Sequence, residues 1–202
     1  LRTHLCGALR PSDVANSVSV CGWVQSSRSL GGLLFLVLRD YSGVIQVVWS
    51  REEAQQSGRL RLFEEIEATP IESVVQVKGT VRGRPTHMVN SKQTTGAVEV
   101  VLDRFEVLNR AEPCPIETPE KDHFSLSNQD QRLRYRFIDL RRPYLQNMLR
   151  LRARIADIVR DHLSRQSFVE VETPYLFKST PEGANEFVVP TRTRGRFYAL
   201  PQ

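Results

Sequence analysis

The order of alternating and helical segments in the first half of the chain is the feature that most constrains its fold. Residues 17–25, SVSVCGWVQ, alternate between apolar and other side chains, which is the pattern of a half-buried strand. Residues 33–39 and 44–49 are largely apolar and are separated by the turn-forming residues 40–43. Since Asp, Ser and Gly favour tight turns, we expect these two segments to form a β-hairpin.

The next segments complete a known order. Residues 51–67 place apolar side chains at helical spacing among glutamates, so we expect a surface helix that ends before Pro70. Residues 74–84 and 97–107 alternate again and predict two more strands. Three strands, a helix and two strands is the order of an OB-fold, a five-stranded barrel that often binds single-stranded nucleic acid.

A different kind of sequence follows the predicted barrel. Residues 109–131 hold three prolines and little apolar periodicity, which predicts a linker. Beyond it we expect a helix over residues 146–165, because its apolar side chains share one face, and a short strand over 168–172 that stops at Pro174.

Composition narrows the class of protein without deciding it. The chain carries 24 Arg but only 4 Lys and has a formal net charge of +5, and arginine suits phosphates, base edges and aromatic rings. Nucleic-acid binding and a plain compositional bias explain this charge equally well. The three cysteines form no CxxC pair, so we expect neither a disulfide framework nor a zinc site. The longest apolar run, 33–38, is too short to span a membrane.

The exposed face of the predicted barrel carries the candidate binding residues. An aromatic ring there would stack on a base, and arginine and amide groups could read the edges of unstacked bases. For each residue alone the structural alternative is strong, since Phe35 could lie in the core and Arg82 and Arg84 could form a solvated edge. The candidates are Arg28 in the loop after the first strand, Phe35 and Gln46 on the next two strands, Arg84 and Asn90 at the fourth, and Glu99 on the fifth.

Two further segments carry chemistry-bearing residues. The stretch from 132 to 165 holds ten arginines against three aspartates, and it could follow a phosphate backbone or simply be a solvated basic helix face. The segment STPEGA contains Glu182 in a glycine-containing loop, where a carboxylate could hold an ammonium group. By spacing alone, a plain surface loop is favoured for this second segment.

Several longer motifs carry a family resemblance over essentially the whole chain. They are VCGWVQSSRSLGG, FLVLRDYSGVIQVV, VKGTVRGR, RLRYRFIDLRRP, FVEVETP, STPEGANEFVVP and GRFYALPQ. In these motifs the chain resembles the amino-terminal part of the aspartyl-tRNA synthetases of the bacterial and mitochondrial type, which are class II enzymes.

The resemblance implies a domain plan and roles for residues. Residues 1–108 would be the OB-fold anticodon-binding domain, 109–131 a hinge, and 132–202 the start of an α+β class II catalytic domain, an antiparallel sheet with helices. FVEVETP would be the first class II motif, with Pro174 at a homodimer interface, and Glu182 would meet the amino group of aspartate. The anticodon contacts implied are Arg28, Phe35, Gln46, Arg84, Asn90 and Glu99.

The resemblance also implies what these residues lack. The second and third class II motifs, which bind ATP and Mg²⁺ in the family, are not in the chain, so we expect no catalytic residue and no metal ligand here. The expected partners are the tRNA for aspartate, aspartate, ATP and a second copy, with neither membrane nor DNA. The expected location is the mitochondrial matrix, or alternatively a bacterial cytoplasm. A binding-only RNA fragment and a sister ligase for asparagine or lysine remain alternatives.

Overall fold

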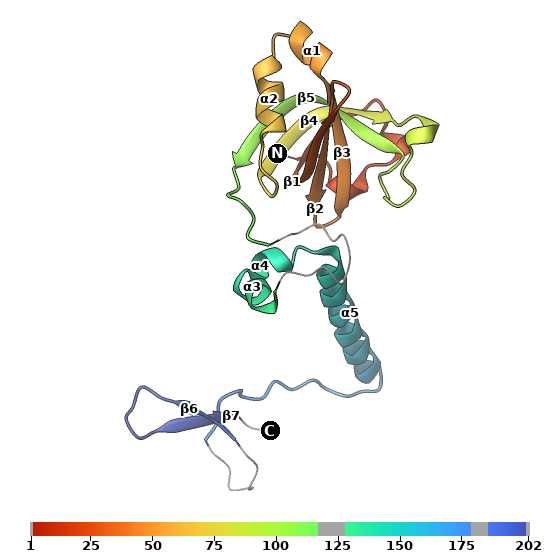
Figure 1. Cartoon of the computed structure of the whole chain (residues 1–202). Coiled ribbons are helices and arrows are strands. Elements are labelled where there is room, and N and C mark those ends of the chain that lie inside the picture. Colours follow the sequence, from red (N-terminus) through yellow and green to blue (C-terminus); the bar gives the residue numbers. More distant parts are fainter. Residues whose placement is uncertain (1, 117–127, 179–185, 201–202) are drawn as a thin grey trace. The chain divides into compact units, whose positions relative to one another are not determined.

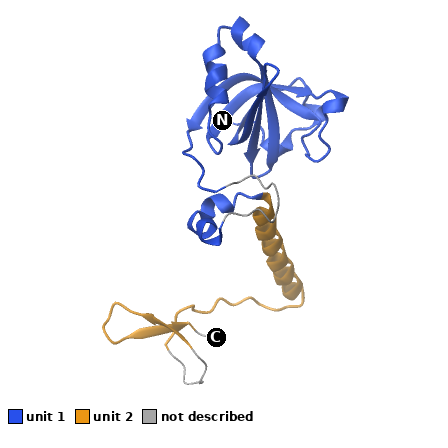
Figure 2. Cartoon of the chain, in the orientation of Figure 1, with its two compact units in different colours: residues 1–142 blue, residues 143–202 orange. Residues whose placement is uncertain are grey.

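The computed structural model describes residues 2–116, 128–178 and 186–200, and it divides into two compact units, Leu1–Arg142 and Pro143–Gln202 (Figure 2). The first unit contains a closed barrel with the strand order β1-β2-β3-β5-β4, and the sequence order is the predicted one (Figure 1). Its strands are β1 (Ser17–Leu30), β2 (Leu33–Asp40), β3 (Gly43–Ser50), β4 (Val74–Gly83) and β5 (Val98–Asn109).

Strand pairing closes the barrel with one parallel contact. β1 pairs antiparallel with both β2 and β4, β2 with β3, and β4 with β5. The remaining contact, between β3 and β5, is parallel and comprises the pairs Val47–Val100 and Val48–Val101. The fold class predicted for this part of the chain, an OB-fold barrel, is therefore confirmed.

Two hairpin turns set the register of the first three strands. Gly31 and Gly32 join β1 to β2 with φ values of 59° and 78°, a left-handed conformation that glycine adopts without strain. At the β2–β3 turn, the Asp40 carboxylate accepts the backbone N–H groups of Ser42 and Cys6, each at 2.8 Å. This carboxylate therefore fixes both the turn and the amino-terminal segment beside it.

The predicted helix over residues 51–67 is two helices, α1 (Arg51–Gln56) and α2 (Leu60–Glu67). The break falls at Gly58, whose φ of 68° ends the first helix. Ala54, Phe63 and Ile66 from these helices are buried in the barrel's hydrophobic core. The core is thus shared by the inward faces of the strands and by the apolar stripe of the two short helices.

Among its described residues, the first unit also contains three short 3-10 helices and two further short α-helices. The 3-10 helices are Cys6–Ala8, Pro11–Asp13 and Thr86–Met88, and the α-helices are α3 (Gln129–Arg134) and α4 (Arg136–Asp139). The carboxylate of Asp139 is fully buried and lies between the guanidinium groups of Arg132, Arg136 and Arg142. Burial alone would raise the pKa of Asp139, but the hydrogen bonds and charges of these arginines outweigh it and lower the pKa.

The described residues of the second unit form α5 (Pro143–Arg165) and a two-stranded antiparallel sheet of β6 (Phe187–Pro190) and β7 (Phe197–Leu200), with extended segments beside them. The helix begins three residues earlier than predicted, with proline at its first position, where a missing N–H costs nothing. Within the described parts of the chain, no helix is both long and apolar enough to cross a bilayer.

The strand predicted over residues 168–172 is wrong. The segment is exposed and has no strand assignment, and nearby only Phe177 forms a β-bridge, to Ala199. A strand requires a partner for its backbone N–H and C=O groups. Among the residues that the structure describes, none pairs with this segment, so its alternating pattern has no ladder to join.

Candidate nucleic-acid interface

A register shift in β1 brings Arg28 to the outer face of the barrel. Val24 pairs with Leu38, but Ser26 pairs with Val37, so Gln25 is an extra residue in β1. One extra residue reverses the side-chain alternation after it. Arg28 therefore lies on a strand and not in the predicted loop, and the bulge turns it away from the core.

Phe35 lies directly opposite Arg28 on β2. The Arg28 guanidinium carbon is 5.5 Å from the centre of the Phe35 ring, a distance typical of a cation–π contact. Leu34 and Leu36, which flank Phe35 on β2, are buried in the core, whereas Phe35 is only half-buried. The ring is thus a partly open aromatic surface on the outer face, not a core residue.

Glu99 is the centre of a polar network on the same face. It is only 5% exposed. Its Oε2 accepts a hydrogen bond from Gln46 Nε2 at 3.0 Å, and its Oε1 accepts from Arg82 Nε and Nη2 at 3.1 and 2.7 Å. Arg82 is therefore not merely a solvated edge residue, because its half-exposed side chain covers the carboxylate.

Arg84 is the most enclosed cation of this face, with a side chain only 6% exposed. Its Nε donates to the Val98 carbonyl at 3.0 Å and lies 3.8 Å from Glu99 Oε2. Burial lowers the pKa of Arg84, Glu99 partly offsets this, and the charge of Arg28 lowers the pKa further. Its Nη2 is buried and finds no hydrogen-bond partner among the described residues, so an acceptor on a ligand would satisfy a costly unpaired donor.

The loop between β4 and β5 folds back on itself at Asn90. The Asn90 N–H donates to the Gly96 carbonyl at 3.1 Å, and the Asn90 carbonyl accepts the Gln93 N–H at 3.1 Å. A Cβ atom at position 96 would lie 1.8 Å from the Asn90 carbonyl oxygen, so only glycine permits this closure. The loop thereby holds Asn90 and Gln93 at the edge of the outer face.

These side chains surround one depression of about 500 Å³. All six predicted binding residues line it, although they come from strands β1, β2, β3 and β5, the end of β4 and the loop after it. An aromatic ring, two amides, a carboxylate and two arginines in one depression can stack on a base and hydrogen-bond its edges. The other lining residues are Gln25, Ser26, Leu30, Val37, Met88 and Gln93.

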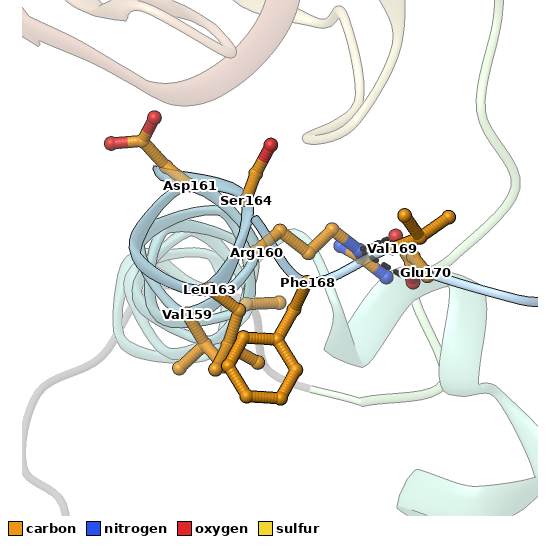
Figure 3. Close-up of a pocket in the computed structure, with 9 residues that line it drawn as sticks. Val159, Arg160, Asp161, Leu163, Ser164, Phe168, Val169 and Glu170 are labelled. Carbon is orange, nitrogen blue, oxygen red and sulfur yellow. Dashed lines mark hydrogen bonds and ion pairs between the residues drawn. The ribbon is translucent and has the colours of Figure 1, made fainter. Parts of the chain in front are cut away.

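A second depression, of about 870 Å³, lies in the second unit between the end of α5 and residues 168–170. Figure 3 shows Val159, Leu163 and Phe168 grouped on one side of it. On another side, Arg160 reaches Glu170, with Nε 3.0 Å from Oε1. This hydrogen bond raises the pKa of Arg160. The lining is mainly apolar and offers no nucleophile–base pair.

The remaining predicted residues are placed as follows. Pro174 is exposed in the extended segment after α5, and Glu182 lies outside the described residues. Of the arginine-rich stretch, Arg132, Arg136 and Arg142 surround Asp139, and this structural role was not predicted. In the described ranges, no three His, Cys, Asp or Glu residues gather in a way that could hold a metal ion.

Comparison with known proteins identifies the two parts of the chain. Residues 18–108 match the model of the OB-fold nucleic acid binding domain, and residues 128–202 match that of the class II tRNA synthetases (D, K and N). Each of the two models thus matches less than half of the chain, in successive parts of its length. The chain is similar over its whole length to the aspartate–tRNA(Asp/Asn) ligases of Thermoanaerobacter pseudethanolicus, at 44% identity, and Legionella pneumophila (strain Corby), at 43%.

The chain spans about a third of the length of these curated relatives, 33% of each. Two solved structures share its fold. The asparaginyl-tRNA synthetase of Pyrococcus horikoshii, complexed with asparaginyl-adenylate, matches 98% of the chain and 42% of its own length, with a TM-score of 0.80 and 24% identity. A putative aspartyl-tRNA synthetase of Leishmania major Friedlin matches 100% of the chain and 39% of its own length, with a TM-score of 0.81 and 22% identity.

Proposed function

We propose that the barrel binds the anticodon loop of the aspartate tRNA in the depression around Phe35, and that the longer protein attaches aspartate to this tRNA. The observation that carries the proposal is the convergence of six predicted residues on one depression. The relatives at 43–44% identity are aspartate–tRNA(Asp/Asn) ligases, which supports aspartate as the amino acid and its tRNA as a substrate.

The depression suits unstacked nucleotides better than a duplex. Its chemistry combines a half-buried aromatic ring, at Phe35, with short-range donors and acceptors, and its size of about 500 Å³ suits one or two bases rather than a helix groove. Single-stranded RNA loops offer splayed bases for such stacking and edge contacts. The exposed cations Arg28 and Arg82 beside it would attract the phosphate backbone.

The ATP-dependent attachment of aspartate to the tRNA is proposed for the whole protein, of which this chain would be one part. Class II enzymes use ATP and Mg²⁺, and we assign both to the proposed attachment of aspartate. The role proposed for the barrel is to bind and place the tRNA. We further propose that a second copy contacts the chain around Pro174 and that Glu182 binds the amino group of aspartate. The proposed location is the mitochondrial matrix.

Binding of an RNA hairpin tests the role of the barrel. The probe is the anticodon stem-loop of the aspartate tRNA, measured by fluorescence anisotropy against the wild-type chain and Arg28→Ala. Since Arg28 is exposed and stacked over Phe35, its loss should weaken binding by at least about 1 kcal/mol, roughly fivefold in Kd. Arg61→Ala, an exposed arginine on α2, is the matched control and should leave Kd unchanged.

Two outcomes would count against the proposal. Equal affinity of Arg28→Ala and the wild type would show that the depression is not the binding site. Equal affinity of the wild type for the hairpin and for unrelated single strands would favour a general single-strand binder.

A further inference from the structure

The carboxylate of Glu72 is shared between a buried arginine and a partly exposed one, all within the first unit. Its Oε1 lies 2.6 Å from Nη2 of Arg39, and the side chains of Arg39 and Glu72 are 8% and 6% exposed. Its Oε2 accepts a hydrogen bond from Nη1 of Arg141 at 2.7 Å, and the side chain of Arg141 is 27% exposed. Water can therefore replace the Arg141 contact more readily than the Arg39 contact.

The same two arginines also share the indole ring of Trp23. The guanidinium carbon of Arg141 lies 4.7 Å from the ring centre and that of Arg39 lies 5.9 Å from it. Arg39 is moreover the residue of β2 that pairs with Trp23 on β1. Without Arg141, Glu72 and Trp23 would each keep Arg39. Because opening a buried ion pair is costly when it leaves a charge without compensation, Arg141 can withdraw at a much smaller cost than Arg39.

Glu72 is fixed on the barrel by contacts that do not involve Arg141. Its φ of 69° places it in the left-handed region, which is unfavourable for a residue other than glycine and is retained where the surrounding structure imposes it. Its N–H donates to the Val24 carbonyl at 2.8 Å, and Arg39 holds its carboxylate. The acceptor for Arg141 is thus already in position before Arg141 binds it.

The segment that carries Arg141, residues 129–142, forms its own charged cluster. Within the described residues, the hydrophobic core cluster of the barrel contains no residue of this segment, and neither α3 nor α4 has an extensive contact with a barrel strand. Arg141 instead reaches out to the barrel. The other arginines that form ion pairs in the segment surround its own Asp139, and they are Arg132, Arg136 and Arg142.

We propose that Arg141 is a releasable attachment, through which residues 129–142 separate from the barrel and rejoin it while Glu72, Arg39 and Trp23 stay assembled. Because α5 begins at Pro143, directly after this segment, the attachment decides whether the start of α5 is tied to the barrel. The inference concerns motion within the chain and does not depend on RNA binding.

Hydrogen exchange of the wild-type chain measures this release. Since α3 and α4 have only six and four residues and such short helices are unstable alone, the released segment should lose amide protection. We expect amides of residues 132–142 to exchange at least about tenfold faster than the slowest amides of the barrel strands. Raising NaCl from 0.1 M to 1 M, which shortens the screening length from about 10 Å to about 3 Å, should speed exchange in the segment at least about threefold. Exchange in the barrel strands should change by less than about 1.5-fold.

A matched pair of arginine variants assigns the release to one side chain. At 0.1 M NaCl, Arg141→Ala should speed exchange in the segment at least about fivefold and remove the response to salt. Arg134→Ala is the control, because Arg134 is an exposed arginine of the same segment whose guanidinium carbon lies 5.7 Å from the Tyr135 ring centre. This variant should keep both the wild-type exchange rates and the response to salt.

Acrylamide quenching of tryptophan fluorescence gives a second readout. The chain has two tryptophans, and Trp49 is buried in the core, so quenching reports mainly on Trp23. Quenching should increase in Arg141→Ala and stay at the wild-type level in Arg134→Ala, because only Arg141 covers the indole ring of Trp23.

Two outcomes would overturn the inference. If the wild-type segment exchanges as slowly as the slowest barrel amides, it separates only when the barrel unfolds. If the response to salt persists in Arg141→Ala, another contact holds the segment. The first outcome is read from the wild type alone, so the test does not depend on the folding of any variant.

Discussion

The guanidinium carbon of Arg141 lies 4.7 Å from the centre of the Trp23 indole ring. Its Nη1 also donates to Glu72 Oε2 at 2.7 Å, and the other oxygen of Glu72 is 2.6 Å from Arg39 Nη2. Glu72 and Arg39 are almost fully buried, whereas Arg141 is 27% exposed. One carboxylate and one indole ring thus attach the segment after α4 to the barrel.

Replacing Arg141 should loosen this attachment. Arg141→Ala removes the contact with Trp23 and leaves Glu72 with Arg39, so we expect the free energy of unfolding to fall by roughly 1–2 kcal/mol. Arg141→Lys keeps the charge but loses the planar group, and it should recover less than half of the loss. Urea unfolding measures both variants. A lysine variant as stable as the wild type would show that charge alone matters.

Two glycines on β4 offer a matched pair of substitutions. A Cβ atom at Gly79 would lie 2.0 Å from the Val101 carbonyl oxygen, at the shifted register between β4 and β5, whereas at Gly83 it would meet nothing within 4 Å. We expect Gly79→Ala to destabilise the barrel by at least roughly 3 kcal/mol, because backbone must move. Gly83→Ala should change stability by less than about 1 kcal/mol. Thermal unfolding checks the pair, and equal melting temperatures would contradict the expected collision.

Asp139 should make stability depend on acid pH. Its pKa is lowered in the folded state, so its ionised form stabilises the fold above the ordinary unfolded value, about 3.9. This contribution is lost as the pH falls from there through the lower folded pKa. Asp139→Asn should therefore lower the free energy of unfolding at pH 7 by roughly 1–3 kcal/mol. The gap from the wild type should narrow below about pH 4.

Urea unfolding at pH 7, 5, 3.5 and 2.5 measures this change for Asp139→Asn. Asp103→Asn, at an exposed carboxylate on β5, serves as the control for the general effect of removing a carboxylate. A gap between Asp139→Asn and the wild type that stays constant down to pH 2.5 would rule out the assigned role.

The strands of the barrel could be predicted because apolar and polar side chains alternate along a half-buried strand. The bulge in β1 could not be predicted. The residues before and after Gln25 each have a sequence compatible with a strand or a loop, so nothing in the sequence marks Gln25 as the extra residue. As a result, the loop predicted for Arg28 is a strand. The helix break had a visible signal in Gly58, but the glutamate and apolar periodicity around it suggested a continuous helix.

Partners distant in the sequence explain the other differences. The same alternation that correctly predicted β4 failed over residues 168–172, because pairing depends on a second strand that local sequence does not reveal. The candidate residues of the depression were predicted as a set, partly through family resemblance. Glu99 accepts hydrogen bonds from Gln46 and Arg82, and these bonds join three strands that are separate in the sequence. A pattern within one strand therefore cannot predict them.

The parallel contact between β3 and β5 is the shortest junction in the barrel, with only two residue pairs. The Gln46–Glu99 hydrogen bond spans the same junction on its outer side. A ligand in the depression therefore contacts both strands at the junction of the barrel that has the fewest paired residues. By mass action, an occupant that favours the joined form also protects it from opening. Backbone amides of Val47 and Val100 should accordingly exchange with solvent deuterium more slowly when RNA is present. Bound RNA would then stabilise the closed form of the barrel that binds it.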